Sequence, residues 1–221
     1  GCWVFMANLA TPAFPADPAT AATATTARQG LAPGMAVKFV EVATTADTLR
    51  QLRKGGFTLY LRHGLTDNSK ADRVPNVDLN DCSTQRPLTE AGRQLMKQVG
   101  EGIRKARIPI DELHVSPMCR TRESAAAAFP GFAQAVDNNL IYLANFTDKD
   151  KAPILANTRS LLSNPVPQGR NRLLLAHAPN LMDLIGYFPK EGTLVIFRPK
   201  GAAGFDYVAS VAPANWSVLL R

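Results

Sequence analysis

The sequence predicts an α/β fold in which a mostly parallel central sheet is flanked by helices, as in a three-layer sandwich. Apolar runs at 57–61 and 173–176 are typical of buried strands, and 112–116 is a shorter third candidate. Segments with a helical pattern separate these runs, and strands that alternate with helices favour a parallel sheet. We therefore expect one folded domain at 37–221.

Helices are expected before and after the first strand. Residues 47–54 are predicted to form a short helix, with Asp47 as its N-cap and a glycine pair directly after its end. From 89 to 106, apolar residues recur at a spacing of four, which marks one face of a helix. Thr89 is a suitable cap for the start of this second helix.

The second half of the chain continues the alternation. Further helices are expected at 120–129 and 151–162. Segments 193–198 and 205–211 both alternate apolar and polar residues, and their connection contains glycine. This pattern predicts an antiparallel hairpin at the edge of the sheet, turning at 200–201.

Two histidines and two arginines follow the predicted strands. Arg62 and His63 come at the end of the first strand, Arg120 lies just beyond the second, and His177 ends the third. In open α/β sheets, ligands bind at the carboxyl ends of the strands. We therefore expect these four side chains to lie together in one site.

This set of residues suits the transfer of a phosphoryl group through a histidine. Neutral imidazole is a competent nucleophile near pH 7, because its ordinary pKa of about 6.5 leaves a lone pair available. Guanidiniums stay charged and meet phosphate oxygens in a two-pronged geometry. Catalysis of this reaction depends mostly on positioning and on neutralising charge on the phosphoryl oxygens.

Three motifs in this order resemble those of the histidine phosphatase superfamily, also called the phosphoglycerate mutase-like superfamily. The motifs lie at 59–64, 116–125 and 175–178, and the segment 82–93 is similar to the stretch that opens the first long helix in many bacterial members. The resemblance runs from about residue 49 to residue 216. It implies a phosphoglycerate mutase-like fold for the predicted sandwich.

The resemblance also implies roles for individual residues. His63 would be the nucleophile that becomes a phosphohistidine, and Arg62, Arg120 and His177 would bind the phosphoryl group and stabilise its transition state. Thr66 would donate its hydroxyl to a phosphate oxygen, unless it serves only the turn. The implied protein is a phosphoric monoester hydrolase of the histidine phosphatase type that needs no metal and no organic cofactor.

The motifs do not identify the acid that protonates the leaving group. The mutase branch carries an acidic or amide residue where this chain has Leu65, and phytase-like phosphatases carry Asp where it has Ala178. Asp67 is the nearest carboxylate to His63 and is our candidate. Its rivals on neighbouring loops are Asp78, Asp81 and Asp148. A good leaving group, such as a phosphohistidine or an aryl phosphate, needs little protonation, so the acid can also be absent.

Three polar residues near the motifs have competing interpretations. Arg86 either lines the rim of the pocket as a substrate-binding residue or belongs to a solvated basic face. Arg122 lies two residues beyond Arg120, so on a helix it points away from its neighbour, and we expect a surface or helix-dipole residue. Asn180 either caps the helix after His177 or donates to phosphate, and we favour capping.

Two functions besides phosphatase activity stay open. Phosphoglycerate mutase-type transfer ranks lower for two reasons. Its substrate is cytoplasmic, whereas we expect an exported protein, and Leu65 replaces the expected acidic residue. A non-catalytic phosphoryl-binding module is the other alternative, because no motif supplies the acid.

Composition indicates a soluble globular protein that attracts anions. The 221 residues are 46% hydrophobic and 19% charged, with a formal net charge of +7 and a pI near 9.6. Such a charge favours a small anionic phosphorylated substrate. Because lysines and arginines are scattered, without a basic stripe interleaved with aromatic residues, we do not expect nucleic-acid binding.

Residues 1–36 differ from the rest of the chain. The uncharged stretch 1–16 resembles the end of a secretory h-region with its cleavage zone, and 17–35, rich in Ala, Thr and Pro, is expected to be a flexible linker. An apolar strand or an anchoring segment is the alternative, and the run is too short to span a bilayer. We therefore expect a signal-peptide remnant and an exported protein, periplasmic in a Gram-negative-like cell or secreted.

Export changes the interpretation of the cysteines. If Cys2 leaves with the signal, Cys82 and Cys119 remain, an even count that suits an oxidising compartment. A disulfide between them would fasten the long loop after His63 next to Arg120. Two buried free thiols are the alternative.

Overall fold

The computed structural model describes residues 38–221, and the expected signal-peptide remnant and linker at 1–36 lie outside the described residues. The described part contains one six-stranded sheet in the order β3-β2-β4-β1-β5-β6. Its strands are β1 (Phe57–Arg62), β2 (Glu112–Val115), β3 (Ala135–Val136), β4 (Asn171–Ala176), β5 (Leu194–Pro199) and β6 (Phe205–Val211). Its helices are α1 (Ala46–Lys54), α2 (Glu90–Lys105), α3 (Cys119–Ala128), α4 (Asp148–Ser163), α5 (Ala178–Ile185) and α6 (Trp216–Leu219).

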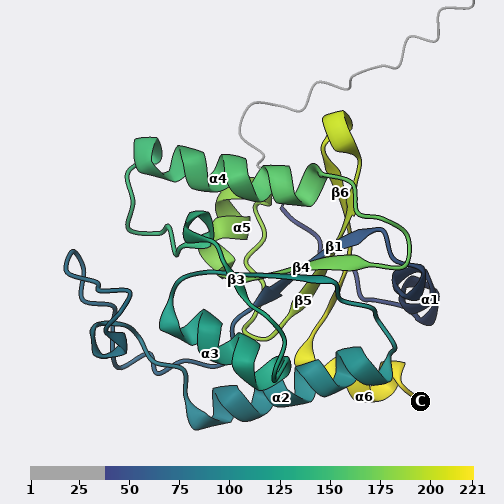
Figure 1. Cartoon of the computed structure of the whole chain (residues 1–221), viewed down its shortest axis with the longest axis horizontal. Coiled ribbons are helices and arrows are strands. Elements are labelled where there is room, and N and C mark those ends of the chain that lie inside the picture. The colour runs from purple at the N-terminus through teal and green to yellow at the C-terminus, as the bar shows by residue number, and fades with distance from the viewer. Residues whose placement is uncertain (1–37) are drawn as a thin grey trace, which may run out of the picture. The chain divides into compact units, whose positions relative to one another are not determined.

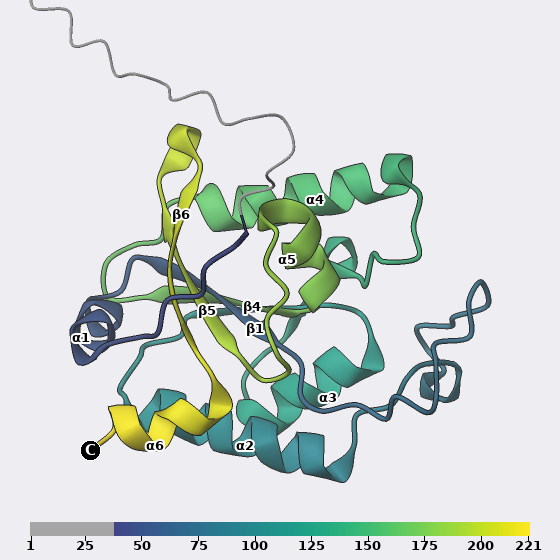
Figure 2. The same cartoon turned by 180° about the vertical axis from the view of Figure 1, so that it is seen from behind.

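The elements form three layers, as the sequence predicts. Helices α4 and α5 cover one face of the sheet, and α2, α3 and α6 cover the other (Figures 1 and 2). Strands β1 to β4 pair in parallel, whereas β5 pairs antiparallel with both β1 and β6. The predicted hairpin is therefore present at the sheet edge, and the α/β fold class is confirmed.

The parallel pairing of β1 and β4 sets the position of the site. The two strands are in register from Phe57 opposite Asn171 to Arg62 opposite Ala176. The backbone N–H of His63 then donates to the carbonyl of Ala176 at 3.2 Å. The residues that follow the two strands therefore emerge side by side at the same edge of the sheet.

Alternating residues of the central strands pack into two hydrophobic cores, one on each face of the sheet. Leu59 and Leu61 of β1 pack with Val99 and Ile103 of α2 in one cluster. Tyr60, between those two leucines, belongs to a second cluster on the face covered by α4 and α5. Because successive strand residues point to opposite faces, a strand buried on both sides reads as a continuous apolar run.

The caps of three helices agree only partly with the sequence predictions. Thr89 caps α2 as expected, accepting a hydrogen bond from the Gly92 N–H at 2.9 Å. The cap of α1 is Thr45 and not Asp47, because the Asp47 side chain instead accepts hydrogen bonds from its own helix. Helix α4 begins earlier than predicted, because Thr147 caps it.

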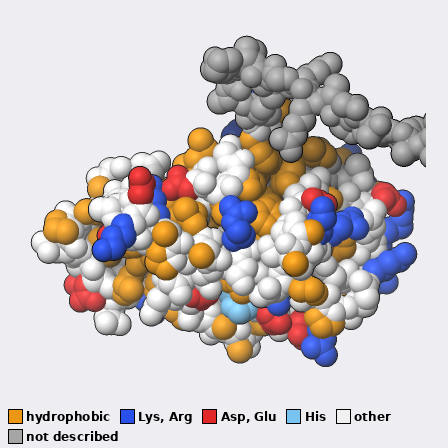
Figure 3. All heavy atoms as spheres, turned by 90° about the horizontal axis from the view of Figure 1, so that it is seen from above, with side chains coloured by type: hydrophobic (Ala, Val, Ile, Leu, Met, Phe, Trp, Pro, Cys, Tyr) orange, Lys and Arg blue, Asp and Glu red, His pale blue; other side chains and the backbone are white. Residues whose placement is uncertain are grey.

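Two further observations concern the surface. On the face shown in Figure 3, lysine and arginine side chains are interspersed with acidic ones. Among the helices of residues 38–221, none combines the length and the apolar character that crossing a membrane requires.

Candidate active site

The two histidines that follow β1 and β4 lie together, as predicted. The ring centroids of His63 and His177 are 5.4 Å apart and both side chains are buried. Their approach follows from the parallel register of the two strands that carry them.

The hydrogen bonds of His63 leave one ring nitrogen free to act as a nucleophile. Its Nδ1 lies 2.8 Å from the carbonyl oxygen of Gly64, which can only accept, so we assign the ring hydrogen to Nδ1. The lone pair is then on Nε2. Burial, and then the positive charge of Arg120, lower the pKa of His63 well below its ordinary value. The imidazole is therefore neutral at pH 7.

A glycine after His63 is needed because β1 ends against the first turn of α2. A Cβ atom at Gly64 would come within 2.6 Å of the carbonyl oxygen of Gly92. The Gly64 N–H also donates to the Ser124 hydroxyl of α3 at 3.0 Å. These contacts fix the carbonyl group that orients the His63 ring.

The second histidine, His177, is held at both its backbone and its ring. Tyr60, buried in the neighbouring strand, donates its hydroxyl to the His177 carbonyl at 2.7 Å and accepts from the His177 N–H at 3.2 Å. The Ser116 hydroxyl lies 2.7 Å from the ring Nε2 and accepts from the Met118 N–H. The Ser116 hydroxyl therefore donates its hydrogen to Nε2, which accepts with its lone pair, and the ring hydrogen of His177 is on Nδ1. Burial, and then the charge of Arg120, lower the pKa of this imidazole too.

Arg120 is fully buried beside a carboxylate that sequence reasoning did not find. Asp72 binds its Nη1 and Nη2 at 3.0 and 3.3 Å and also accepts the Arg86 N–H at 2.7 Å. The ring of Tyr142 lies over the same guanidinium, 5.0 Å from its centre. Arg120 is therefore fixed in position before any ligand arrives.

Arg62, like Arg120, lies beside a carboxylate and an aromatic ring. Its Nη1 donates to the Pro189 carbonyl at 2.7 Å, and its Nη2 lies 3.4 Å from the carboxylate of Glu191. The ring of Phe188 lies 5.1 Å from the guanidinium carbon. Thr66, predicted to meet phosphate, donates its hydroxyl to the same Glu191 oxygen at 3.2 Å. In this structure Thr66 therefore supports the partner of Arg62.

Arg86 joins this group of residues, which favours the pocket interpretation over the solvated face. Its positive charge contributes to lowering the pKa of His63 and of His177. Within residues 38–221, four buried donors of the site have no hydrogen-bond partner. They are Arg62 Nε, Arg86 Nε, Arg120 Nε and His177 Nδ1. Because buried donors are nearly always satisfied, a group of four without partners indicates a place for an anion.

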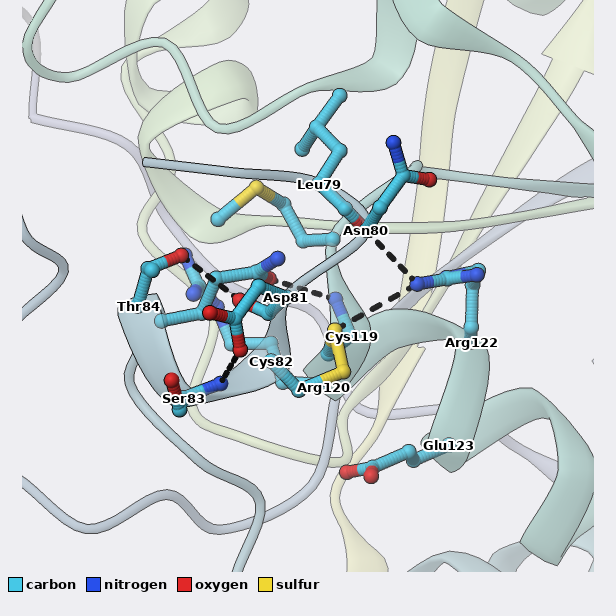
Figure 4. Close-up of a disulfide and its surroundings, with 12 residues drawn as sticks. Leu79, Asn80, Asp81, Cys82, Ser83, Thr84, Cys119, Arg120, Arg122 and Glu123 are labelled. Atoms are coloured by element: carbon cyan, nitrogen blue, oxygen red, sulfur yellow. Dashed lines mark hydrogen bonds between the residues drawn. A yellow bond between two sulfur atoms is a disulfide. The ribbon is translucent and has the colours of Figure 1, made fainter. Parts of the chain in front are cut away.

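The segment 65–88, which carries Asp72 and Arg86, is fastened to the start of α3. Cys82 and Cys119 form a disulfide, as one of the two sequence interpretations proposed (Figure 4). The Cys119 N–H donates to Gln85 Oε1 at 2.8 Å, and Arg122 donates to the Leu79 carbonyl at 3.1 Å. Arg122 is therefore half-buried against this segment, which differs from the simple surface position that the sequence led us to expect. The disulfide is compatible with an extracytoplasmic location.

The carboxylates predicted from the sequence as possible acids bond within their own loops. Asp67 accepts hydrogen bonds from the backbone and hydroxyl of Ser69, at 3.0 and 2.6 Å. Asp78 and Asp81 make the same type of turn contact with residues two positions further on. Asp148 lies in the first turn of α4. The role of Asp67 as a proton donor stays a prediction.

Asn180 has a different role from the expected helix cap. It is fully buried, and its Nδ2 donates to the Ile141 carbonyl at 3.0 Å. The side chain thus connects α5 to the segment that carries Tyr142. As for metals, residues 38–221 contain no group of three or more His, Cys, Asp or Glu side chains that could hold an ion.

The fold and the site define an α/β protein in which buried imidazoles and guanidiniums gather at the edge of the sheet. Residues 59–140 match the sequence model of the histidine phosphatase superfamily (branch 1). Over this stretch, which contains His63 and Arg120, the chain is similar to that superfamily.

Of three similar solved structures, the first supports the fold. The protein histidine phosphatase SixA complexed with tungstate superposes with a TM-score of 0.50 at 16% identity, covering 72% of this chain and 98% of that chain. A mycobacterial glucosyl-3-phosphoglycerate phosphatase complexed with VO3 has a TM-score of 0.48 at 17% identity, covering 70% and 98%. Phosphoserine phosphatase of Entamoeba histolytica in complex with 3-phosphoglyceric acid has a TM-score of 0.47 at 13% identity, covering 71% and 96%. No curated protein matches the chain.

Proposed function

We propose that the protein is a phosphatase that hydrolyses a phosphomonoester or a phosphoramidate through a covalent phosphohistidine on His63. The observation that carries this proposal is a buried neutral imidazole with a free Nε2, surrounded by four buried donors without partners. Such a pocket supplies both the nucleophile and the charge that phosphoryl transfer requires.

The reaction takes place in two displacements at phosphorus. First, the lone pair of His63 Nε2 forms a bond to phosphorus, and the bond from phosphorus to the leaving oxygen or nitrogen breaks with its electron pair. Water then attacks the phosphohistidine, which releases inorganic phosphate and restores the imidazole. Arg62, Arg86, Arg120 and His177 Nδ1 donate to the phosphoryl oxygens and offset their charge in both steps.

The leaving group takes its proton from water or leaves as an anion in this proposal. The carboxylates that contact Arg120 and Arg62 are those of Asp72 and Glu191, and each is engaged in an ion pair with its arginine. The proposal therefore favours substrates with good leaving groups, while Asp67 remains the candidate acid from the sequence.

Release of inorganic phosphate from p-nitrophenyl phosphate, and separately from a phosphohistidine peptide, tests the proposal. We expect turnover of at least one substrate by the wild type, none by His63→Ala, and a trapped phosphoryl label on His63. Turnover of neither, with phosphate still bound, would support the non-catalytic module. Transfer of the label to a second phosphoglycerate without free phosphate would support the mutase alternative.

We also propose that the protein works in the periplasm. The disulfide and the apolar, uncharged stretch 1–16 support this location. Mass spectrometry of the protein from its native host is the test. A mature N-terminus at Gly1 or earlier would overturn the export proposal.

A further inference from the structure

An apolar pocket of about 340 Å³ adjoins the proposed phosphate site. Its walls include Val74, Val77 and Leu79 from the segment 65–88, and Met118, Tyr142 and Phe146 from the facing elements. We propose that this pocket holds the alcohol part of the substrate, and that this alcohol is apolar, as in an aryl phosphate monoester. This inference rests on the proposed function.

The pocket adjoins the proposed phosphate site, because two of its lining residues contact Arg120 or His177. Asp72 lines the pocket and binds both Nη atoms of Arg120. Tyr142 also lines it, while its ring lies over the Arg120 guanidinium and meets the ring of His177 edge-on at 5.5 Å. A group bonded to a phosphoryl oxygen between Arg120 and His177 therefore has this pocket directly beside it.

The walls of the pocket select against polar alcohols. The polar groups among the lining side chains are the carboxylate of Asp72, which is engaged by Arg120, the amide of Asn145 and the hydroxyl of Tyr142, and the other lining side chains are apolar. A sugar or glycerol would place several hydroxyls against these walls, and a buried hydroxyl without a partner is unfavourable. An aryl ring has no hydroxyls that need hydrogen-bond partners, and it can stack against Tyr142 and Phe146.

The size and the exposure of the walls agree with an organic group of one or two rings. A cavity of roughly 150 Å³ is enough for benzene, and ligand pockets begin near about 300 Å³. Phe146 and Val74 leave 37% and 54% of their surfaces exposed. Apolar side chains exposed around a pocket lose this contact with water when an apolar ligand binds.

An aryl alcohol also fits the proton balance of the proposed reaction. Its oxygen leaves readily as an anion, so the bond to phosphorus can break without a proton donor. The carboxylate nearest to the junction of pocket and phosphate site is Asp72, which is ion-paired with Arg120. The apolar pocket and a reaction that needs no proton donor thus favour the same class of substrate.

Calorimetric binding to His63→Ala tests the inference without needing turnover. The probes are 1-naphthyl phosphate and glycerol 1-phosphate, with inorganic phosphate as the reference. We expect 1-naphthyl phosphate to bind at least about tenfold more tightly than glycerol 1-phosphate. In the same background Phe146→Asp should abolish this preference, whereas Phe146→Leu should keep most of it. Val218→Asp, at a side chain that is 62% exposed outside the pocket, is the matched control.

The possible outcomes separate this inference from the proposed function. Equal binding of the two esters, or a preference that survives Phe146→Asp, would overturn the apolar pocket even if the wild type hydrolyses phosphate esters. A preference for the naphthyl ester that Phe146→Asp removes would support the pocket. If the wild type then hydrolyses neither ester nor a phosphohistidine peptide, the proposed function fails while the pocket assignment stands.

Discussion

Replacing Asp72 by asparagine should reveal how the protein keeps a fully buried arginine in place without a ligand. The side chain of Arg120 is 0% exposed and that of Asp72 is 9% exposed. Removing one partner of a buried ion pair usually destabilises a protein by about 3–5 kcal/mol, because the remaining charge is left uncompensated. Asparagine keeps one acceptor oxygen, so we expect a loss of about 3 kcal/mol in the free energy of unfolding.

The same substitution should make stability depend more strongly on phosphate. A ligand that binds only the folded state stabilises it by RT ln(1 + [L]/Kd). In Asp72→Asn, phosphate would supply the negative charge that Arg120 has lost, so its affinity for the site should rise. Added inorganic phosphate should therefore stabilise Asp72→Asn more than the wild type.

Urea unfolding of both proteins, with and without inorganic phosphate, measures these two effects. Asp111→Asn is the matched control, because Asp111 pairs with Arg170 in an exposed position and should contribute less than about 1 kcal/mol. Our interpretation of Asp72 is refuted if Asp72→Asn unfolds within about 0.5 kcal/mol of the wild type. It is also refuted if phosphate stabilises the two proteins equally.

Three further predictions concern protons and the disulfide. The lowered pKa of His63 and of His177 means that, below about pH 6.5, the unfolded chain binds protons that the folded protein does not. Unfolding free energy should therefore fall as pH drops from 6.5, by up to about 1.4 kcal/mol per unit for each histidine, and His63→Asn or His177→Asn should reduce the slope in urea titrations. The bridge of Cys82 closes a loop with a sequence separation of 37, so Cys82→Ser should lower unfolding free energy by up to about 4 kcal/mol, and a reductant should affect only the wild type. Asp67→Asn should leave aryl phosphate hydrolysis unchanged, whereas a loss of about 10²-fold confined to alkyl phosphates would identify Asp67 as the acid.

The sequence was sufficient for five of the six strands and for the histidines and arginines that follow them. Apolar runs such as that of β1 are distinct because the central strands are buried on both faces. Strand β3 has only two residues, which is too short for any pattern. The motifs around His63 and His177 identify the histidines, but the register that places them side by side is a property of the folded sheet.

The partners of the arginines could not be predicted because they come from distant parts of the chain. Asp72 is 48 residues from Arg120, in a segment without periodicity, and Glu191 is 129 residues from Arg62. The helical period predicts which side chains share a face of a helix, but it does not predict which other segment packs against that face. Arg122 illustrates this, since it points away from the phosphate site and yet binds the segment 65–88.

The carboxylates that fix the arginines should also promote release of the product. Glu191 places a negative charge beside Arg62, so it offsets part of the attraction between that guanidinium and inorganic phosphate. Glu191→Gln preserves an oxygen for Arg62 and for the Thr66 hydroxyl, so the change is mainly one of charge. Inhibition by inorganic phosphate should then become about tenfold stronger, equivalent to about 1.4 kcal/mol, when measured on p-nitrophenyl phosphate hydrolysis. Unchanged or weaker inhibition would mean that Glu191 serves to position Arg62 and does not limit the affinity for phosphate.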